Sequence, residues 1–290
     1  MSDKNILKIF VKKNTGKLEL YDPKKIENTC IKAGASKKEA EEIIKEIEKI
    51  LYNGITTKEI YNEVLRFLDA KNAIAGIKYR LKEAIMKLGP EGFAFETFFS
   101  KLLNELGYKT TLRKIVKGLC VAHEIDIIAE KPIEKQKVMV ECKYHNSPGI
   151  YTGLKEILYT YARFLDLRDG WEKGLCEKFD EAWLITNTKF SEEAKEYAKC
   201  KGIKIIGWSY PPNQGIEKLI ENNKGLYPIT ILRKVKEEDL KKFSSANLIV
   251  INDILTKTEG ELAKTAEISL EEALEIRREA KLLISNKLIS

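Results

Sequence analysis

The sequence has no long hydrophobic run, few cysteines and very few histidines. Its 290 residues include only 5 cysteines and 2 histidines. None of its apolar runs approaches the roughly 20 residues that span a bilayer, and residues 1–8 lack the pattern of a signal peptide. An odd number of cysteines without a regular framework is typical of free thiols in a reducing compartment. We therefore expect a cytoplasmic protein with no membrane partner.

The bulk composition is that of a folded, moderately basic protein. Hydrophobic residues make up 43% of the chain and charged residues 33%, which is typical of globular domains. Lysine and arginine total 51 against 44 acidic residues, for a net charge of +7, which permits an anionic partner without requiring one. A chain of this length predicts two or three domains.

Two strand-like apolar segments, residues 123–129 and 137–143, each carry acidic residues. Side chains of a strand alternate between faces, so Glu141 and Lys143 share one face. Charges in a strand as apolar as Val-Met-Val-Glu-Cys-Lys are costly unless they are paired or bind a metal. Asp126 and Glu141 therefore form a candidate site for Mg²⁺ or Mn²⁺, with Lys143 beside an attacking water. The alternative is a set of solvated strand charges, and Glu124 fits either a third ligand or an outward charge.

Residues 92–210 follow the order α-β-β-β-α-β-α-β and resemble the Mrr-like branch of the PD-(D/E)xK nucleases. The resemblance rests on Glu96 in a helix over residues 93–106, on Asp126 in the second strand, and on the triplet 141–143 in the third. It implies a metal-dependent DNA endonuclease that leaves 5′-phosphates. The resemblance implies that Asp126 and Glu141 hold the metal and that Lys143 assists the water. It implies that Glu96 supports the metal or orients a ligand.

Residues 6–20 predict a β-hairpin with a polar turn that ends at Gly16, and Asp22-Pro23 predicts the start of a helix. Helical patterns follow to Leu88, and Gly89-Pro90 marks a boundary. This segment resembles the ATP cone, a nucleotide-sensing domain. The resemblance implies ATP or dATP as effector, and it places Val11 near the base and Lys12, Lys13 and Lys25 at the phosphates. The alternative is a small α/β domain with a solvated basic turn.

Residues 248–255, 259–266 and 269–283 predict short helices that resemble a helix-hairpin-helix unit. Such units bind the DNA backbone through a glycine-containing turn, and Glu267 stands where the glycine is expected. A packing or dimerisation role is an equal alternative.

Three further patterns each fit either a functional role or an ordinary structural one. Cys120-x-x-His123 and Cys142-x-x-His145 have zinc-like spacing, but positions i and i+3 of a strand face opposite sides. His145 shares the strand parity of Lys143, so either a phosphate contact or a solvated histidine is consistent with it. Tyr159 and Arg163 share a helix face that suits either a DNA strand or ordinary packing.

We therefore predict an α/β fold: a restriction-endonuclease-like central mixed β-sheet flanked by helices, preceded by a small α+β ATP-cone-like domain and followed by a helical tail. The expected domains are residues 1–89, 90–228 and 229–290. The predicted function is metal-dependent cleavage of DNA under nucleotide control. A catalytically inactive, nucleotide-sensing DNA-binding protein is the alternative. A homodimer is a candidate assembly, because cutting both strands of a duplex normally requires two sites.

Overall fold

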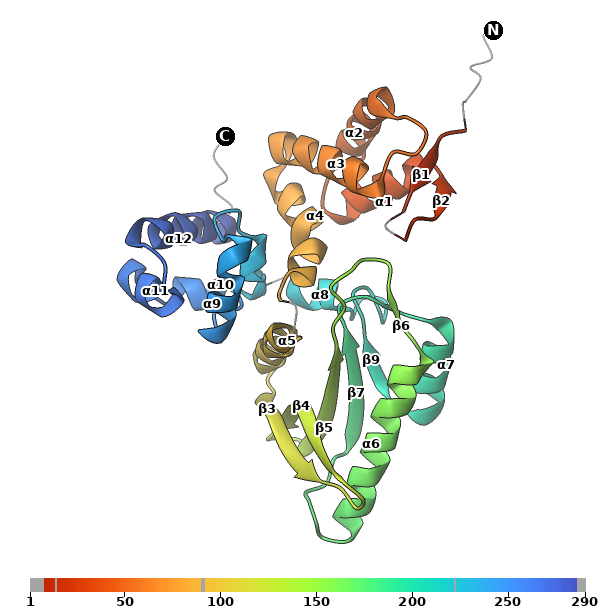
Figure 1. Ribbon diagram of the computed structural model, residues 1–290, viewed down its shortest axis with the longest axis vertical. Helices are drawn as coiled ribbons and strands as arrows, with labels where there is room; N and C mark the ends of the chain where they lie inside the picture. Colours follow the sequence, from red (N-terminus) through yellow and green to blue (C-terminus); the bar gives the residue numbers. More distant parts are fainter. Residues whose placement is uncertain (1–7, 14, 90–91, 222, 286–290) are drawn as a thin grey trace. The chain divides into compact units, whose positions relative to one another are not determined.

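The computed structural model describes residues 8–13, 15–89, 92–221 and 223–285. Residues 6, 7 and 14 of the predicted hairpin and Pro90 of the predicted boundary lie outside these ranges. The chain divides into two compact units, with the division between Lys82 and Glu83 (Figure 1).

The first unit is a β-hairpin followed by helices. Its elements are β1 (Phe10–Lys12), β2 (Leu18–Leu20), α1 (Pro23–Lys32), α2 (Lys37–Ile50), α3 (Thr57–Lys71) and the first part of α4 (Ala73–Met86). Asp22 caps α1 as predicted, and Ser36 and Thr56 form capping boxes with the glutamates three residues later. Asn72 separates α3 from α4, and its side chain accepts a hydrogen bond from Ala75 N–H.

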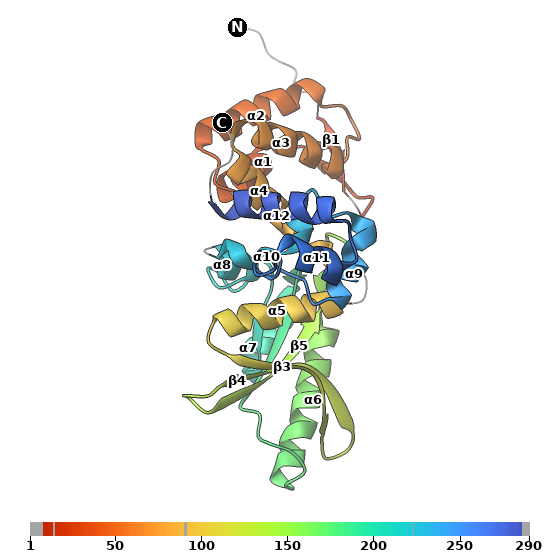
Figure 2. The same ribbon diagram turned by 90° about the vertical axis from the view of Figure 1, so that its left-hand side faces the viewer.

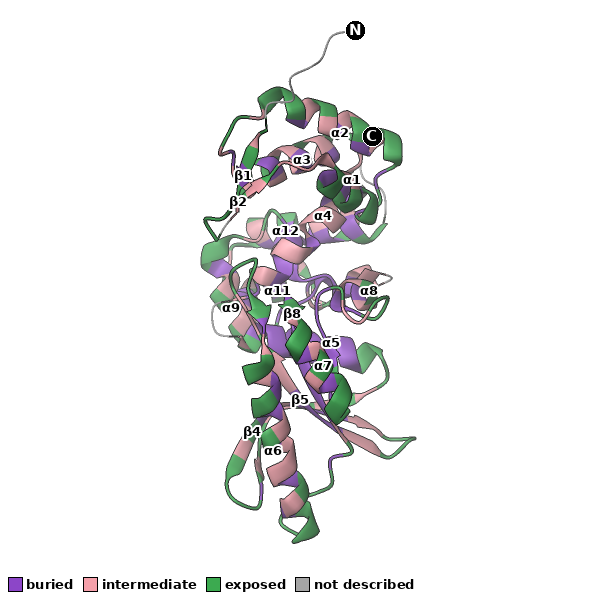
Figure 3. Cartoon of the chain, turned by 90° about the vertical axis from the view of Figure 1, so that its right-hand side faces the viewer, coloured by how far each residue is buried: buried purple, intermediate pink, exposed green. Residues whose placement is uncertain are grey.

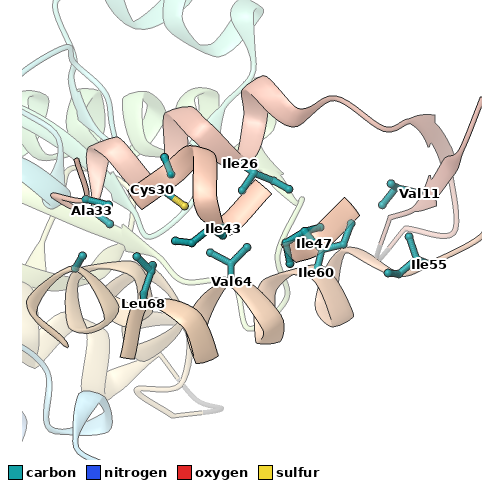
Figure 4. Packing of buried hydrophobic residues seen from close by; sticks show 13 residues of the cluster. Val11, Ile26, Cys30, Ala33, Ile43, Ile47, Ile55, Ile60, Val64 and Leu68 are labelled. Carbon is teal, nitrogen blue, oxygen red and sulfur yellow. The ribbon is translucent and has the colours of Figure 1, made fainter. Parts of the chain in front are cut away.

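The core of this unit forms where the apolar faces of the helices meet. Ile43 and Ile47 of α2 pack against Val64 and Leu68 of α3, and Cys30 of α1 is fully buried between them (Figure 4). The spacing of three or four residues places these side chains on one face of each helix.

The second unit is built on a five-stranded sheet with the order β3-β4-β5-β7-β9. The strands are β3 (Lys109–Lys117), β4 (Ala122–Lys131), β5 (Gln136–Lys143), β7 (Glu181–Thr186) and β9 (Lys204–Ile206). The first three pair antiparallel and the last two join in parallel, so the sheet is mixed as predicted. A small sheet of β6 (Tyr151–Thr152) and β8 (Lys189–Phe190) was not predicted, because a two-residue strand has no periodic signal.

Helices cover both faces of this sheet. Helix α5 (Phe93–Glu105) lies against β3 and β4, whereas α6 (Leu154–Glu172) and α7 (Glu192–Lys201) lie on the other face (Figures 1 and 2). Along α6, buried residues recur every three or four positions, with exposed residues between them (Figure 3). Strand β5 lies between β4 and β7, and Val138, Met139 and Val140 are fully buried. A central strand with both faces covered requires this apolar run.

Short helices complete the second unit. They are α8 (Ile216–Glu221), α9 (Leu240–Ser245), α10 (Ile251–Leu255), α11 (Glu259–Ala266) and α12 (Leu270–Ser285), with three single 3₁₀ turns before α9. Glu267 has a φ of 53°, the left-handed conformation for which a glycine was expected. Within the described ranges, no helix is long and apolar enough to cross a membrane.

Candidate active site

Two predicted acidic residues meet across neighbouring strands. The register pairs Ile127 with Val140, so one step further Asp126 of β4 lies opposite Glu141 of β5. On the other side of Asp126, the pairs formed by Leu112 and Lys114 place Arg113 of β3 in the same row. Directly opposed residues of antiparallel strands lie close together. The sheet therefore holds a cation and two carboxylates side by side.

Each of the two carboxylates is held through one oxygen. Cys142 N–H donates to Oδ2 of Asp126 at 2.7 Å. Oε2 of Glu141 forms an ion pair with Nη1 of Arg163, which reaches it from α6. Arg163 also donates from Nη2 to the carbonyl oxygen of Glu124. No described residue donates a hydrogen bond to the second oxygen of either acid, so both acids keep one oxygen for a ligand.

Glu96 joins this group from α5. Its side chain is 11% exposed, and Oε2 accepts a hydrogen bond from Nη1 of Arg113 at 2.9 Å. Arg113 has a φ of 51°, an unusual conformation for a residue within a strand. Such strained backbone is concentrated at functional sites. The fold therefore gathers Glu96, Asp126 and Glu141, which the sequence places far apart.

Burial makes the ionised forms of these acids unfavourable. Burial, together with the charge of Asp126, raises the pKa of Glu141 to about 7. Burial also raises the pKa of Asp126, although the Cys142 N–H and the charge of Arg163 lower it. Burial raises the pKa of Glu96, and the hydrogen bond from Arg113 opposes that shift. Buried, interacting acids with raised pKa values are concentrated at functional sites.

The donor set fits a hard divalent cation. Mg²⁺ and Mn²⁺ prefer oxygen ligands, and Mg²⁺ commonly takes one or two carboxylates plus water and phosphate oxygens. Asp126 and Glu141 supply two carboxylates, each with one oxygen that receives no hydrogen bond from the described residues. Within the part of the chain that the structure describes, no group of three or more His, Cys, Asp or Glu side chains is arranged to hold a metal by itself.

Lys143 lies at the end of β5, where it pairs in register with Thr186 of β7, and its side chain is exposed. Its charge lowers the pKa of Glu141, so the two side chains are near one another. The structure thus places the lysine beside the acids and in contact with solvent.

Arg163 and Arg113 were not predicted as parts of this site. The sequence predicts only that Arg163 shares a helix face with Tyr159, for either a DNA strand or ordinary packing. The guanidinium carbon of Arg163 lies 5.3 Å from the centroid of the Tyr159 ring, and Arg163 is 7% exposed whereas Tyr159 is 59% exposed. The sequence feature that could have indicated a buried Arg163 is its position inside the apolar helix segment Tyr-Ala-Arg-Phe-Leu. The role of Arg113 could not be predicted, because nothing in the sequence indicates its left-handed backbone conformation.

The ring of His123 contacts a carboxylate of α6. Its Nε2 lies 2.7 Å from Oδ2 of Asp166 on α6, and Cys120 N–H donates to the other oxygen of Asp166 at 2.7 Å. These contacts attach the hairpin between β3 and β4 to α6. Because no metal-holding group is found among the described residues, the zinc reading has no support there.

The predicted nucleotide residues lie in and around the hairpin of the first unit. Lys13 and Lys25 both form ion pairs with Glu19 of β2, the first at 2.6 Å. Lys12 N–H donates to the carbonyl oxygen of Ile55 at 2.9 Å, and Val11 is 7% exposed within the hydrophobic core. Two of the three lysines are thus brought together around one carboxylate.

Comparisons with known proteins agree with this arrangement. A family model described as a restriction endonuclease matches residues 89–208, and a model of the ATP cone domain matches residues 9–83. A protein of Archaeoglobus fulgidus that carries the name Uncharacterized protein is 49% identical over 185 residues, which are 64% of this chain and 99% of that protein. A crystal structure of a protein of unknown function is 46% identical with a TM-score of 0.57, and the match covers 67% of this chain and 99% of the other.

Proposed function

Because the chain belongs to the Mrr-type restriction endonuclease family and carries an ATP cone domain, we propose that it is a metal-dependent DNA endonuclease controlled by ATP or dATP. The observation that carries the proposal is the pairing of Asp126 with Glu141, each with one carboxylate oxygen to spare, beside Lys143. We also propose the division into residues 1–89, 90–228 and 229–290, with DNA as substrate and a homodimer as the cutting form.

The roles follow from the chemistry of the side chains. Asp126 and Glu141 would hold Mg²⁺ or Mn²⁺, which when bound polarises the phosphate and lowers the pKa of a water. Lys143 donates hydrogen bonds to the water or to a phosphate oxygen, and its charge opposes the negative charge that develops on the phosphate. Glu96 and Arg113 hold one another and shape the rim next to Asp126.

A cleavage assay tests this function. Supercoiled, linear, branched and methylated DNA are incubated with Mg²⁺, Mn²⁺ or EDTA, with and without ATP or dATP. The wild type should cut only with metal, and Asp126→Asn and Lys143→Met should reduce cutting to background. Lys137→Met is the matched control, since Lys137 lies on β5 with the same parity and pairs with Glu130 and Glu177. Equal cutting by the wild type and Asp126→Asn would contradict the assignment.

A second candidate is a DNA-binding protein that does not cut. The observation in its favour is the Arg163–Glu141 ion pair, since a cation already neutralises one proposed metal ligand. Salt-sensitive DNA binding without cutting in every condition would support this alternative.

A further inference from the structure

His145 follows Lys143 by two residues and is fixed by buried polar side chains. Its N–H donates to Oδ1 of Asn187 at 2.9 Å, and Nδ2 of Asn187 donates to its carbonyl oxygen at 2.7 Å. Asn187 is fully buried just after β7. Its amide therefore continues the pairing of β5 with β7 beyond the pair of Lys143 and Thr186. A solvated loop histidine would not need this support.

The ring of His145 is also fixed. Nε2 lies 2.9 Å from Oγ1 of Thr152, and this hydroxyl donates to Oγ1 of Thr186 at 2.9 Å. Both threonines are fully buried. A hydroxyl has one hydrogen, so Thr152 must accept the bond from Nε2. Nε2 then carries the proton, and Nδ1 presents a lone pair that receives no hydrogen bond from the described residues.

The surroundings keep this imidazole neutral. Burial lowers the pKa of His145, and the charge of Lys143 lowers it further. Glu156 of α6 acts in the opposite direction. Thr152 of β6 contacts the ring through its hydroxyl, which in turn bonds to the hydroxyl of Thr186 on β7. A lone-pair nitrogen does not bind phosphate oxygens, which are themselves acceptors. The partner of Nδ1 must therefore be a hydrogen-bond donor.

We propose that His145 is the proton acceptor of this site and acts on the water that attacks the phosphodiester. This inference rests on the proposed nuclease function. The water oxygen forms the new bond to phosphorus, and one water proton passes to Nδ1. The bond from phosphorus to the leaving sugar oxygen breaks with its electron pair, and that oxygen takes a proton from solvent. Glu141 is paired with Arg163, so Nδ1 of His145 is the neutral acceptor near Lys143.

The ring itself gives a test that needs no cleavage. The chain has two histidines, so nitrogen NMR of the metal-free protein should resolve both rings. His145 should carry its proton on Nε2 and titrate below its ordinary pKa of about 6.5. His123, bonded to Asp166, identifies the second signal by its loss in His123→Asn. In Thr152→Val the preference for Nε2–H should be lost, whereas Thr152→Ser should keep it. A proton on Nδ1 in the wild type would overturn the proposal.

The second test compares single-turnover cleavage at saturating Mg²⁺ across pH. General-base catalysis contributes about 10²–10⁴-fold, so His145→Asn should lose rate in that range. It should also lack the rise in rate with pH that we expect of the wild type below neutrality. Mn²⁺ binding measured by calorimetry should be unchanged. Both proteins must be measured in the same metal, because Glu141 also titrates, with a pKa of about 7 in the metal-free protein. Only the part of the pH dependence that His145→Asn removes is then assigned to His145.

The remaining outcomes distinguish failure of the proton-acceptor role from failure of the proposed nuclease function. If His145→Asn keeps the rate, or loses rate but keeps the wild-type pH profile, the proton-acceptor role is wrong and the nuclease assignment stands. If the wild type cuts no DNA in any condition, the proposed function fails and this role fails with it, whatever the tautomer.

Discussion

Arg163 of α6 forms a buried ion pair with Glu141 of β5, the acid that lies at the centre of the candidate site. The guanidinium also donates to the carbonyl oxygen of Glu124, and its buried Nε has no hydrogen-bond partner among the described residues. Arg163 thus links the helix on one face of the sheet to two adjacent strands. It is also the counter-charge of Glu141 in the metal-free protein.

Replacing Arg163 with methionine should destabilise the second unit strongly. Removing one partner of a buried ion pair typically costs about 3–5 kcal/mol, because the other charge stays buried. Denaturant unfolding at pH 8 measures the loss, which should shrink at pH 5, where Glu141 is protonated. Arg168→Met is the control on the same helix: its pair with Asp169 is about half exposed and should contribute at most about 1 kcal/mol. Equal effects of the two substitutions would contradict the structural role of Arg163.

Glu141 should make the metal-free protein less stable as the pH rises. Its pKa in the folded protein is about 7, above the ordinary glutamate value of about 4.3 in the unfolded chain. Between these two pKa values the folded state binds more protons than the unfolded state, so the free energy of unfolding falls as the pH rises. The stability contributed by protonated Glu141 is present near pH 4 and is lost as the pH rises through about 7. A shift of this size corresponds to about 3–4 kcal/mol.

The measurement is the unfolding midpoint at pH 5 and pH 8 in EDTA for the wild type and Glu141→Gln. The wild type should lose more stability than the variant between these pH values, and Mn²⁺ should cancel the difference by binding the ionised acid. If the variant shows the same pH dependence as the wild type, Glu141 does not titrate in this range.

Glu19 should compete with a nucleotide for Lys13 and Lys25. Because Glu19 pairs with both lysines, a triphosphate that takes its place must break these pairs. Glu19→Gln should therefore tighten ATP binding several-fold, and Lys25→Ala should weaken it about tenfold, which corresponds to about 1.4 kcal/mol. Calorimetry with ATP and dATP measures both changes. Glu46→Gln is the control, since Glu46 pairs with Lys49 in the same unit, and weaker binding in Glu19→Gln would contradict the competition.

The sequence was sufficient for features that depend on local pattern. The mixed sheet with flanking helices was predicted correctly, because apolar runs with period two and apolar faces with period 3.6 are direct consequences of strand and helix geometry. Asp126 and Glu141 stood out for the same reason, as charges in strands that are otherwise apolar. Their roles remain predictions until cleavage is measured.

The rest depends on tertiary contacts that leave no local pattern. Arg163 reaches Glu141 across 22 residues of sequence, and only the packing of α6 on the sheet decides that contact. The support of His145 by Asn187 spans 42 residues. Arg113 and Glu267 adopt left-handed backbone without being glycine, so their neighbours impose a conformation that the residue types do not predict.

Two helical glycines should respond oppositely to alanine. A Cβ on Gly170 of α6 would lie 2.8 Å from the carbonyl carbon of Gly118 and 2.9 Å from the nitrogen of Leu119, so the hairpin between β3 and β4 would have to move. Gly170→Ala should therefore lower the free energy of unfolding by about 1–3 kcal/mol. Gly260 of α11 has nothing within 4 Å of an added Cβ, so Gly260→Ala should raise it by about 0.5 kcal/mol through helix propensity. Denaturant unfolding measures both, and stabilisation by Gly170→Ala would show that the hairpin does not pack on α6 as closely as these distances require.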